Sequence, residues 1–180
     1  MKESELTTQT VFVVDDEPDV RAALRLLIKS VGYRVECFAS ADEFFAQFDT
    51  AHTGCLVLDI RMPGMSGMDL QEKLTEMEAV LPIIMISGHG EIPMAVKAVQ
   101  SGAVDFLQKP FSDQQLLDRI AQALEMDKSR RLKKAERNKV LEKYQSLTPR
   151  EKQIDVDHQV LEKLLIRAFS ARRKTIRNAL

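Results

Sequence analysis

Four short apolar segments of this chain each lead into polar residues that can take part in chemistry. The segments are residues 11–14, 55–58, 83–86 and 103–107, and the polar residues that follow are Asp15 with Asp16, Asp59, Ser87 and Lys109. Apolar runs of this length are typical of strands that are buried on both faces of a parallel sheet. Such sheets bind ligands at the carboxyl ends of their strands. The sequence therefore predicts one sheet edge on which three carboxylates, a hydroxyl and a lysine converge.

Strand and helix patterns alternate over the first 122 residues. Strands are expected near residues 10–15, 33–38, 54–59, 82–87 and 103–107. Between them, apolar residues recur at the 3.6-residue spacing of amphipathic helices, and Ser40 stands where it can cap the second helix. This alternation indicates an α/β fold in which a doubly wound, five-stranded parallel sheet carries helices on both faces.

The fifth helical pattern continues far beyond the sheet, because no glycine or proline occurs between residues 112 and 146. We expect one extended C-terminal helix whose part beyond Met126 is either a solvated linker or a weak coiled coil. Thr148, Pro149 and Glu151 then have the spacing of a new helix start with a capping box. The predicted domains are an α/β domain over 10–125, a basic linker helix over 126–147 and a short helical tail over 148–180.

Charge is distributed unevenly along the 180 residues, although the net charge is only −1. Residues 1–122 contain 10 Lys/Arg and 19 Asp/Glu, a net −9, whereas residues 123–180 contain 16 and 8, a net +8. The basic part is suited to nucleic acid, or else the two parts are simply solvated or attract each other. The chain has no run of 18 apolar residues and no apolar signal core at its start, so we expect a cytoplasmic protein without a membrane span.

The predicted acidic edge has the chemistry of a phosphoryl acceptor. Two or three carboxylates held together need a cation, and their oxygen ligands favour Mg²⁺. Asp59 can then attack a phosphoryl group to form an acyl phosphate, while Lys109 and Ser87 bind the phosphoryl oxygens. Taken singly, Asp15 and Asp16 could be helix caps, Ser87 a turn serine and Lys109 a surface lysine. Their placement on four strand ends favours the joint site.

On these residues, the segment 10–125 resembles the receiver domain of two-component response regulators, which has a flavodoxin-like fold. The resemblance implies that Asp59 is the phosphorylation site and that Mg²⁺ is held by Asp15, Asp16, Asp59 and the backbone carbonyl of Arg61. It also implies that Ser87 and Phe106 are the switch residues. Further motifs at 87–90 and 95–98 are most similar to the FixJ group. The implied partners are a sensor histidine kinase and a second copy after phosphorylation, and the implied output is transcription from DNA.

The last residues do not complete this resemblance. Residues 147–153 resemble the opening of a LuxR-type helix-turn-helix output domain, but only 27 residues follow Gln153. Residues 167–178 instead resemble a segment near the end of ribosomal-RNA adenine dimethyltransferases, without any catalytic part. We interpret 148–180 as an incomplete output domain followed by a tail that is natural, fused or engineered. We expect at most nonspecific nucleic-acid binding from it.

Two other functions are compatible with parts of the sequence. A Mg²⁺-dependent hydrolase could also use an aspartyl phosphate, but the haloacid-dehalogenase enzymes have a second acid where this chain has Arg61. An RNA-binding protein could act through the basic helix at residues 160–180. The favoured interpretation is a phosphoacceptor that is not an enzyme in its own right, although it has self-phosphorylation and dephosphorylation chemistry.

Overall fold

A five-stranded parallel sheet forms the centre of the fold, in the strand order β2-β1-β3-β4-β5. The computed structural model describes residues 9–88 and 92–146. Within them the strands are β1 (Thr10–Val14), β2 (Arg34–Phe38), β3 (Gly54–Asp59), β4 (Ile83–Ser87) and β5 (Asp105–Gln108). All four strand pairings are parallel, which confirms the predicted sheet. The last strand begins two residues later than the sequence predicts.

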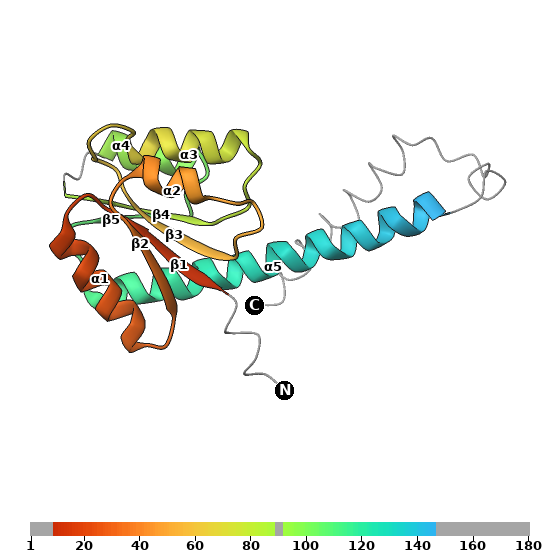
Figure 1. Cartoon of the computed structure of the whole chain (residues 1–180), viewed down its shortest axis with the longest axis horizontal. Coiled ribbons are helices and arrows are strands. Elements are labelled where there is room, and N and C mark those ends of the chain that lie inside the picture. Colours follow the sequence, from red (N-terminus) through yellow and green to blue (C-terminus); the bar gives the residue numbers. More distant parts are fainter. Residues whose placement is uncertain (1–8, 89–91, 147–180) are drawn as a thin grey trace. The chain divides into compact units, whose positions relative to one another are not determined.

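Helices cover both faces of this sheet, as Figure 1 shows. The helices are α1 (Pro18–Ser30), α2 (Ala41–Gln47), α3 (Gly67–Glu76), α4 (Ile92–Gln100) and α5 (Asp113–Ser146). Helices α1 and α5 lie on one face, and α2, α3 and α4 lie on the other. The predicted doubly wound α/β class is therefore confirmed.

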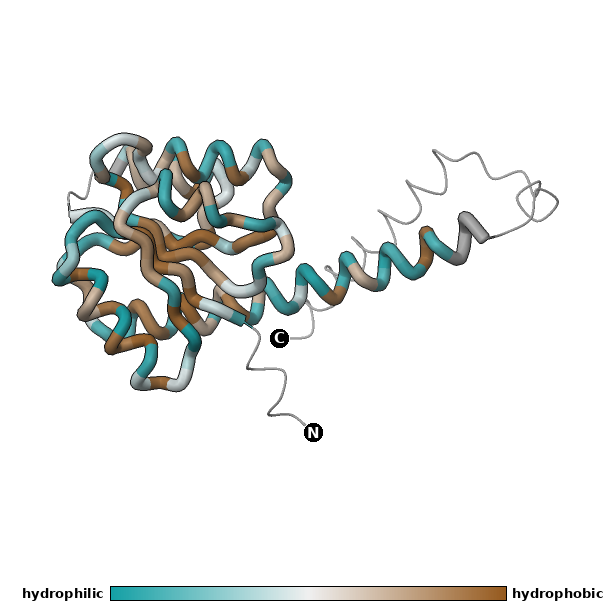
Figure 2. Tube along the Cα trace, in the orientation of Figure 1, coloured by the Kyte–Doolittle hydropathy of each residue, from teal (hydrophilic) through white to brown (hydrophobic). Residues whose placement is uncertain are grey.

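Alternate strand residues divide the core into two clusters. On β1, Phe12 and Val14 face the cluster under α2, α3 and α4, whereas Val11 and Val13 face the cluster under α1 and α5. The period of two between the faces of a strand requires this division. Because both faces are covered, each central strand is apolar apart from its end residues, and the strands form the brown centre of Figure 2.

Local signals set where two of the helices begin. The Ser40 hydroxyl accepts a hydrogen bond from the Glu43 amide, which confirms the cap expected for α2. Ser66 forms a full capping box with Asp69 at the start of α3. At α1, Glu17 occupies the cap position without a side-chain hydrogen bond, so Asp15 and Asp16 are not the caps that they could have been.

Helix α5 is the extended C-terminal helix that the sequence predicts, with 34 residues. The chain divides into two compact units, Met1–Lys133 and Lys134–Leu180, and the domain boundaries expected from the sequence stay predictions. The capping box at Thr148 and the tail that follows it lie outside the described residues. No helix in the described part of the chain is long and apolar enough to cross a membrane.

Candidate functional site

The carboxyl ends of four strands bring the predicted site residues to one edge of the sheet. Asp15 and Asp16 follow β1, Asp59 ends β3, Ser87 ends β4 and Lys109 follows β5. The register places Asp59 beside Ile86 and Ser87 beside Gln108. Parallel pairing alone is enough to gather these residues, because every strand ends on the same side.

Lys109 lies among three carboxylates at this edge. Its Nζ is 2.8 Å from Asp15 Oδ2, 3.2 Å from Asp59 Oδ1 and 3.8 Å from Glu17 Oε1. Asp15 is completely buried, and Asp59 is 5% exposed. A buried carboxylate requires a charged or hydrogen-bonding partner, and the Lys109 ammonium provides one for both aspartates.

The electrostatic environment of Asp59 differs from that of an exposed aspartate. Burial raises the pKa of Asp59; the ammonium of Lys109 opposes that shift, and the neighbouring charges of Asp15 and Asp16 add to it. Burial alone would lower the pKa of Lys109, but its bonds and charge pairs with Asp15 and Asp59 outweigh burial and raise it. Lys109 is therefore held in its charged form beside an acid whose negative charge is only partly compensated.

The remaining predicted residues lie on the same strands or directly after them, and they differ in exposure. Ser87 is buried at the end of β4, and Asp16 is half-buried. Arg61 is exposed two residues after Asp59. Phe106 is half-buried on β5 and packs against the cluster under α2, α3 and α4. Phe106 therefore lies on the face of the sheet that is opposite to α1 and α5.

The oxygen donors at this edge suit a hard cation. Mg²⁺ is usually bound through one or two carboxylates and several waters, and Asp15 and Asp59 are two buried carboxylates that share a cationic neighbour. Within residues 9–88 and 92–146, no three His, Cys, Asp or Glu side chains form a group already arranged around a metal position. The Lys109 ammonium is the cation that pairs with both carboxylates in this arrangement. The charge of Asp16 is close enough to raise the pKa of Asp59.

Three residues of the site region were not anticipated from the sequence. Glu17 reaches Lys109, and its amide donates to Asp15 Oδ1 at 2.9 Å. The sequence feature that could have indicated Glu17 is its position as the third acidic residue in a row after β1. Gly67 packs so closely on β3 that an added Cβ would lie 2.2 Å from the Asp59 carbonyl oxygen. Arg21 donates a hydrogen bond to the Asp15 backbone carbonyl, and no local sequence pattern predicts this contact.

Comparison with known proteins identifies the family to which this sequence is similar. The sequence profile described as the response regulator receiver domain matches residues 11–121. Response regulator protein TodT of Pseudomonas putida is 46% identical over 144 residues, which cover 80% of this chain and 63% of TodT. Transcriptional regulatory protein FixJ of Rhizobium meliloti is 38% identical over 149 residues, covering 83% of this chain and 73% of FixJ.

Solved structures are similar in the same region. The structure of response regulator StyR superimposes with a TM-score of 0.78 at 43% identity, covering 87% of this chain and 83% of that one. The structure of FixJ-N has a TM-score of 0.62 at 43% identity and covers 65% of this chain and 94% of that one. The chain thus spans less than two thirds of the length of TodT, although it covers most of the solved regulators.

Proposed function

The chain belongs to the response regulator receiver domain family, and from this premise we propose that Asp59 accepts a phosphoryl group from a sensor histidine kinase. The observation that carries the proposal is the contact of a buried carboxylate, Asp59, with Lys109 at 3.2 Å on the binding edge of the sheet. An isolated buried carboxylate would be too costly to keep charged. Lys109 and the partial exposure of the edge keep it available as a nucleophile.

The chemistry follows from the charges around Asp59. As one Asp59 oxygen forms a bond to phosphorus, the bond from phosphorus to the donor histidine nitrogen breaks, and the imidazole leaves. The incoming phosphoryl oxygens are negative, so Lys109 exchanges a carboxylate partner for them, and Ser87 donates a hydrogen bond. A Mg²⁺ ion held by Asp15, Asp16, Asp59 and the Arg61 carbonyl would supply the additional positive charge that this transfer needs.

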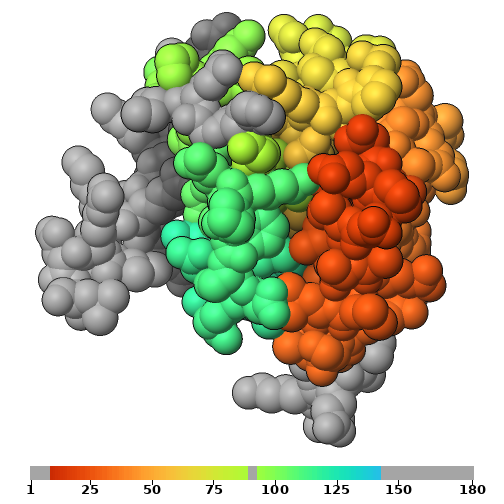
Figure 3. All heavy atoms as spheres, turned by 90° about the vertical axis from the view of Figure 1, so that its left-hand side faces the viewer, coloured from red at the N-terminus to blue at the C-terminus, as the bar shows by residue number. Residues whose placement is uncertain are grey.

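The kinase requires a docking surface beside Asp59, and an apolar groove lies next to Lys109. The groove is lined by Val20, Ala23, Leu24, Leu26, Leu27, Ser30, Lys109, Pro110, Phe111 and Asp113. Leu26 is 72% exposed, the highest fraction among the large apolar side chains of the described residues. Figure 3 shows the two contributing segments, α1 in red and the start of α5 in green, at one side of the molecule. We assign this groove to an apolar helix face of the kinase.

Phosphorylation would be read on the surface formed by α4, β5 and α5. Phe106 is partly buried behind this surface, and Val96 and Val99 on α4 are about half exposed. The Arg119 Nε atom lies 2.6 Å from Asp105 Oδ2 and ties α5 to β5. Movement of Ser87 and Phe106 would change this surface and favour a homodimer by shifting an existing equilibrium. By analogy with the transcriptional regulatory protein FixJ, the output of the whole protein would be transcription.

We regard the chain as a phosphoacceptor with its own chemistry and not as an enzyme. A hydrolase of the haloacid-dehalogenase kind would need an acid at Arg61. The exposed arginine there has no proton to give at neutral pH. The proposal is therefore restricted to accumulation and slow loss of the phosphoryl group on Asp59.

The test is intact mass measurement after incubation with Mg²⁺ and acetyl phosphate. The protein should gain the mass of one phosphoryl group, and Asp59→Asn should gain none. Asp118→Asn, an exposed aspartate on α5, is the matched control and should label like the wild type. Full labelling of Asp59→Asn, or undiminished labelling in excess EDTA, would contradict the proposal.

A further inference from the structure

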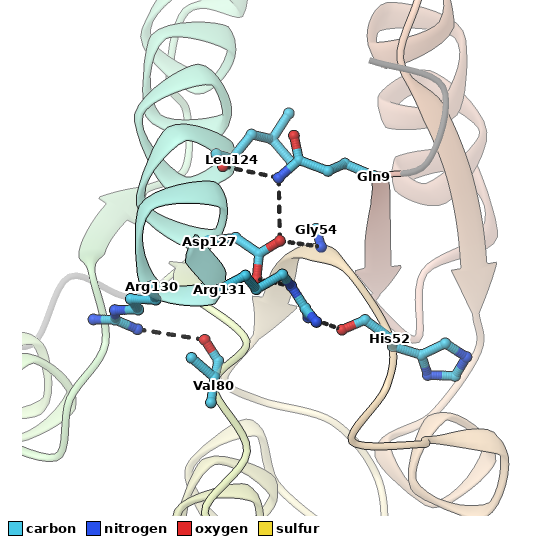
Figure 4. A network of polar contacts seen from close by, with 8 residues as sticks. All are labelled: Gln9, His52, Gly54, Val80, Leu124, Asp127, Arg130 and Arg131. Carbon is cyan, nitrogen blue, oxygen red and sulfur yellow. Dashed lines mark hydrogen bonds and ion pairs between the residues drawn. The ribbon is translucent and has the colours of Figure 1, made fainter. Parts of the chain in front are cut away.

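A buried carboxylate lies at the opposite edge of the sheet from Asp59. Asp127, on α5, is completely inaccessible to solvent, and Figure 4 shows the polar groups that surround it. Its Oδ2 accepts the Gly54 amide at 3.0 Å and the Gln9 side-chain amide at 3.1 Å, and its Oδ1 accepts Arg131 Nε at 2.8 Å. Both oxygens are thus occupied by donors from β3, from the residue before β1 and from α5 itself.

Two more contacts close the network. Gln9 Nε2 also donates to the Leu124 carbonyl at 2.9 Å, and an Arg131 Nη donates to the His52 carbonyl. We call this network the Asp127 clasp; its residues are Gln9, His52, Gly54, Leu124, Asp127 and Arg131. Arg130 adds only a long bond of 3.4 Å from its guanidinium to the Val80 carbonyl.

The clasp begins where the hydrophobic attachment of α5 ends. The buried apolar residues of α5 are Leu116, Ile120, Ala123 and Leu124. In the described part of α5 beyond Leu124, Asp127 is the buried residue, and most of the others are exposed. The last turns of α5 that contact the sheet are therefore held by hydrogen bonds to the Asp127 carboxylate. Removing any one partner would leave a buried polar group without its hydrogen bond.

Gly54 has a backbone conformation that allows this contact. Its φ is +134°, and an added Cβ would lie 1.8 Å from the Thr10 carbonyl oxygen. A side chain at this position is excluded by the backbone of β1, and the glycine amide is directed to Asp127. The charge of Asp127 is also felt inside β3, because it adds to burial in raising the pKa of the Cys55 thiol.

The two strands held by the clasp are those that end in the candidate site. β3 starts at Gly54 and ends at Asp59, and β1 leads from Thr10, next to Gln9, to Asp15. The first turn of α5 follows Lys109 by only a short loop. Helix α5 is thus joined near its start to the phosphoryl-binding edge and is fixed by the clasp at the far edge.

We infer that the Asp127 clasp is the fixed point of α5, about which a displacement at the Lys109 end is passed to the residues after Arg131. The coupling to Lys109 rests on the proposed function, whereas the fixing of α5 does not. A rigid helix that packs on the sheet through residues 116–124 and is pinned at Asp127 transmits a shift of its first turn to the residues beyond the pin. Without the clasp, the same displacement would be absorbed by loosening of residues 124–133.

Hydrogen exchange read by mass spectrometry tests the fixing of α5. Asp127→Ala and Arg131→Ala should each accelerate exchange of residues 124–133 and of Gly54 by about tenfold or more. Arg130→Ala removes an equal charge from the same turn and should change exchange by less than about twofold. Unchanged exchange in β4 would show that the fold is intact. Wild-type exchange at 124–133 in Asp127→Ala and Arg131→Ala would overturn the inference.

If Asp127→Ala does not fold, Asp127→Asn decides the same point, since its amide oxygen can still accept the Gly54 amide while an uncharged NH2 donor replaces the oxygen that accepts from Arg131. The coupling is tested by adding acetyl phosphate and Mg²⁺, with labelling of Asp59 measured separately by mass. Phosphorylation should alter exchange at 132–142 in the wild type and not in an equally labelled Arg131→Ala. An equal response in both would overturn the coupling. Absence of labelling in the wild type would instead contradict the proposed function and leave the fixing of α5 standing on its own data.

Discussion

At the scale of single residues, the decisive property of the site is that a carboxylate is kept buried beside an ammonium. Asp59 has a raised pKa mainly because of burial, despite its contact with Lys109. A raised folded-state pKa means that the folded protein binds a proton more tightly than the unfolded chain does. Ionisation of Asp59 therefore lowers stability, and this loss grows as the pH rises through the raised pKa.

Replacing Asp59 with asparagine should accordingly stabilise the protein in EDTA. The gain in the free energy of unfolding should be present at neutral pH, decrease as the pH falls through the raised pKa, and vanish below the ordinary aspartate value of about 4. Urea unfolding at several pH values measures it, with exposed Asp118→Asn as the control. A gain that is the same at acidic and neutral pH would show that burial of the charge is not its cause.

A second residue prediction concerns Gly67, whose added Cβ would meet the Asp59 carbonyl at 2.2 Å. Gly67→Ala should cost roughly 1–3 kcal/mol of stability, as overpacking against fixed atoms does. It should also slow labelling of Asp59 by acetyl phosphate, because the β3 backbone must shift. Gly88→Ala follows Ser87 directly and meets no atom within 4 Å, so it is the control for both measurements. Wild-type stability and labelling of Gly67→Ala would show that the loop yields without moving β3.

At the scale of elements, the α1 groove and the reactive edge can be separated by experiment. Leu26→Arg places a charge on the groove and should reduce phosphoryl transfer from a cognate histidine kinase about fivefold or more, as loss of an interface anchor does. Labelling by acetyl phosphate should be unchanged, since Leu26 lies on α1 and supplies no group to the reactive edge. Leu132→Arg, an equally drastic change at an exposed α5 position, should affect neither reaction. If Leu26→Arg slows phosphoryl transfer from the kinase and labelling by acetyl phosphate to the same degree, the groove is not the kinase surface.

At the scale of the whole molecule, the sequence was sufficient for the fold but not for its long-range polar contacts. Apolar runs ending in Asp15, Asp59 and Ser87 identified the strands and their reactive edge, because parallel strands must end together. Asp127 could not be found in this way. It is one acid in a basic segment, and its burial depends on Gly54, which is 73 residues away in the sequence. Such a pairing exists only after the sheet has formed.

The charge asymmetry leads to a prediction for the complete chain. Residues 123–180 have a net charge of +8, so the chain should bind DNA weakly, and this binding should collapse between about 50 and 200 mM salt. We expect no sequence preference, because basic residues alone contact the phosphate backbone. The measurement is a competition gel shift with random genomic fragments at near-physiological salt. Enrichment of one site would show that residues 148–180 contain a working recognition element.

The Asp127 clasp also determines where this protein can be cut and rejoined. A fragment ending at residue 121, where the family profile ends, keeps Leu116 and Ile120 but loses the carboxylate that receives the Gly54 amide. The Gly54 amide would then lose its charged acceptor, and that end of the sheet would lose the cover of Ala123 and Leu124, so the fragment should be less stable than the longer chain. Recombination that gives a receiver a new output module, whether in evolution or in the laboratory, should therefore keep the junction beyond Arg131. Hybrids joined earlier would inherit a complete reactive edge on a weakened scaffold.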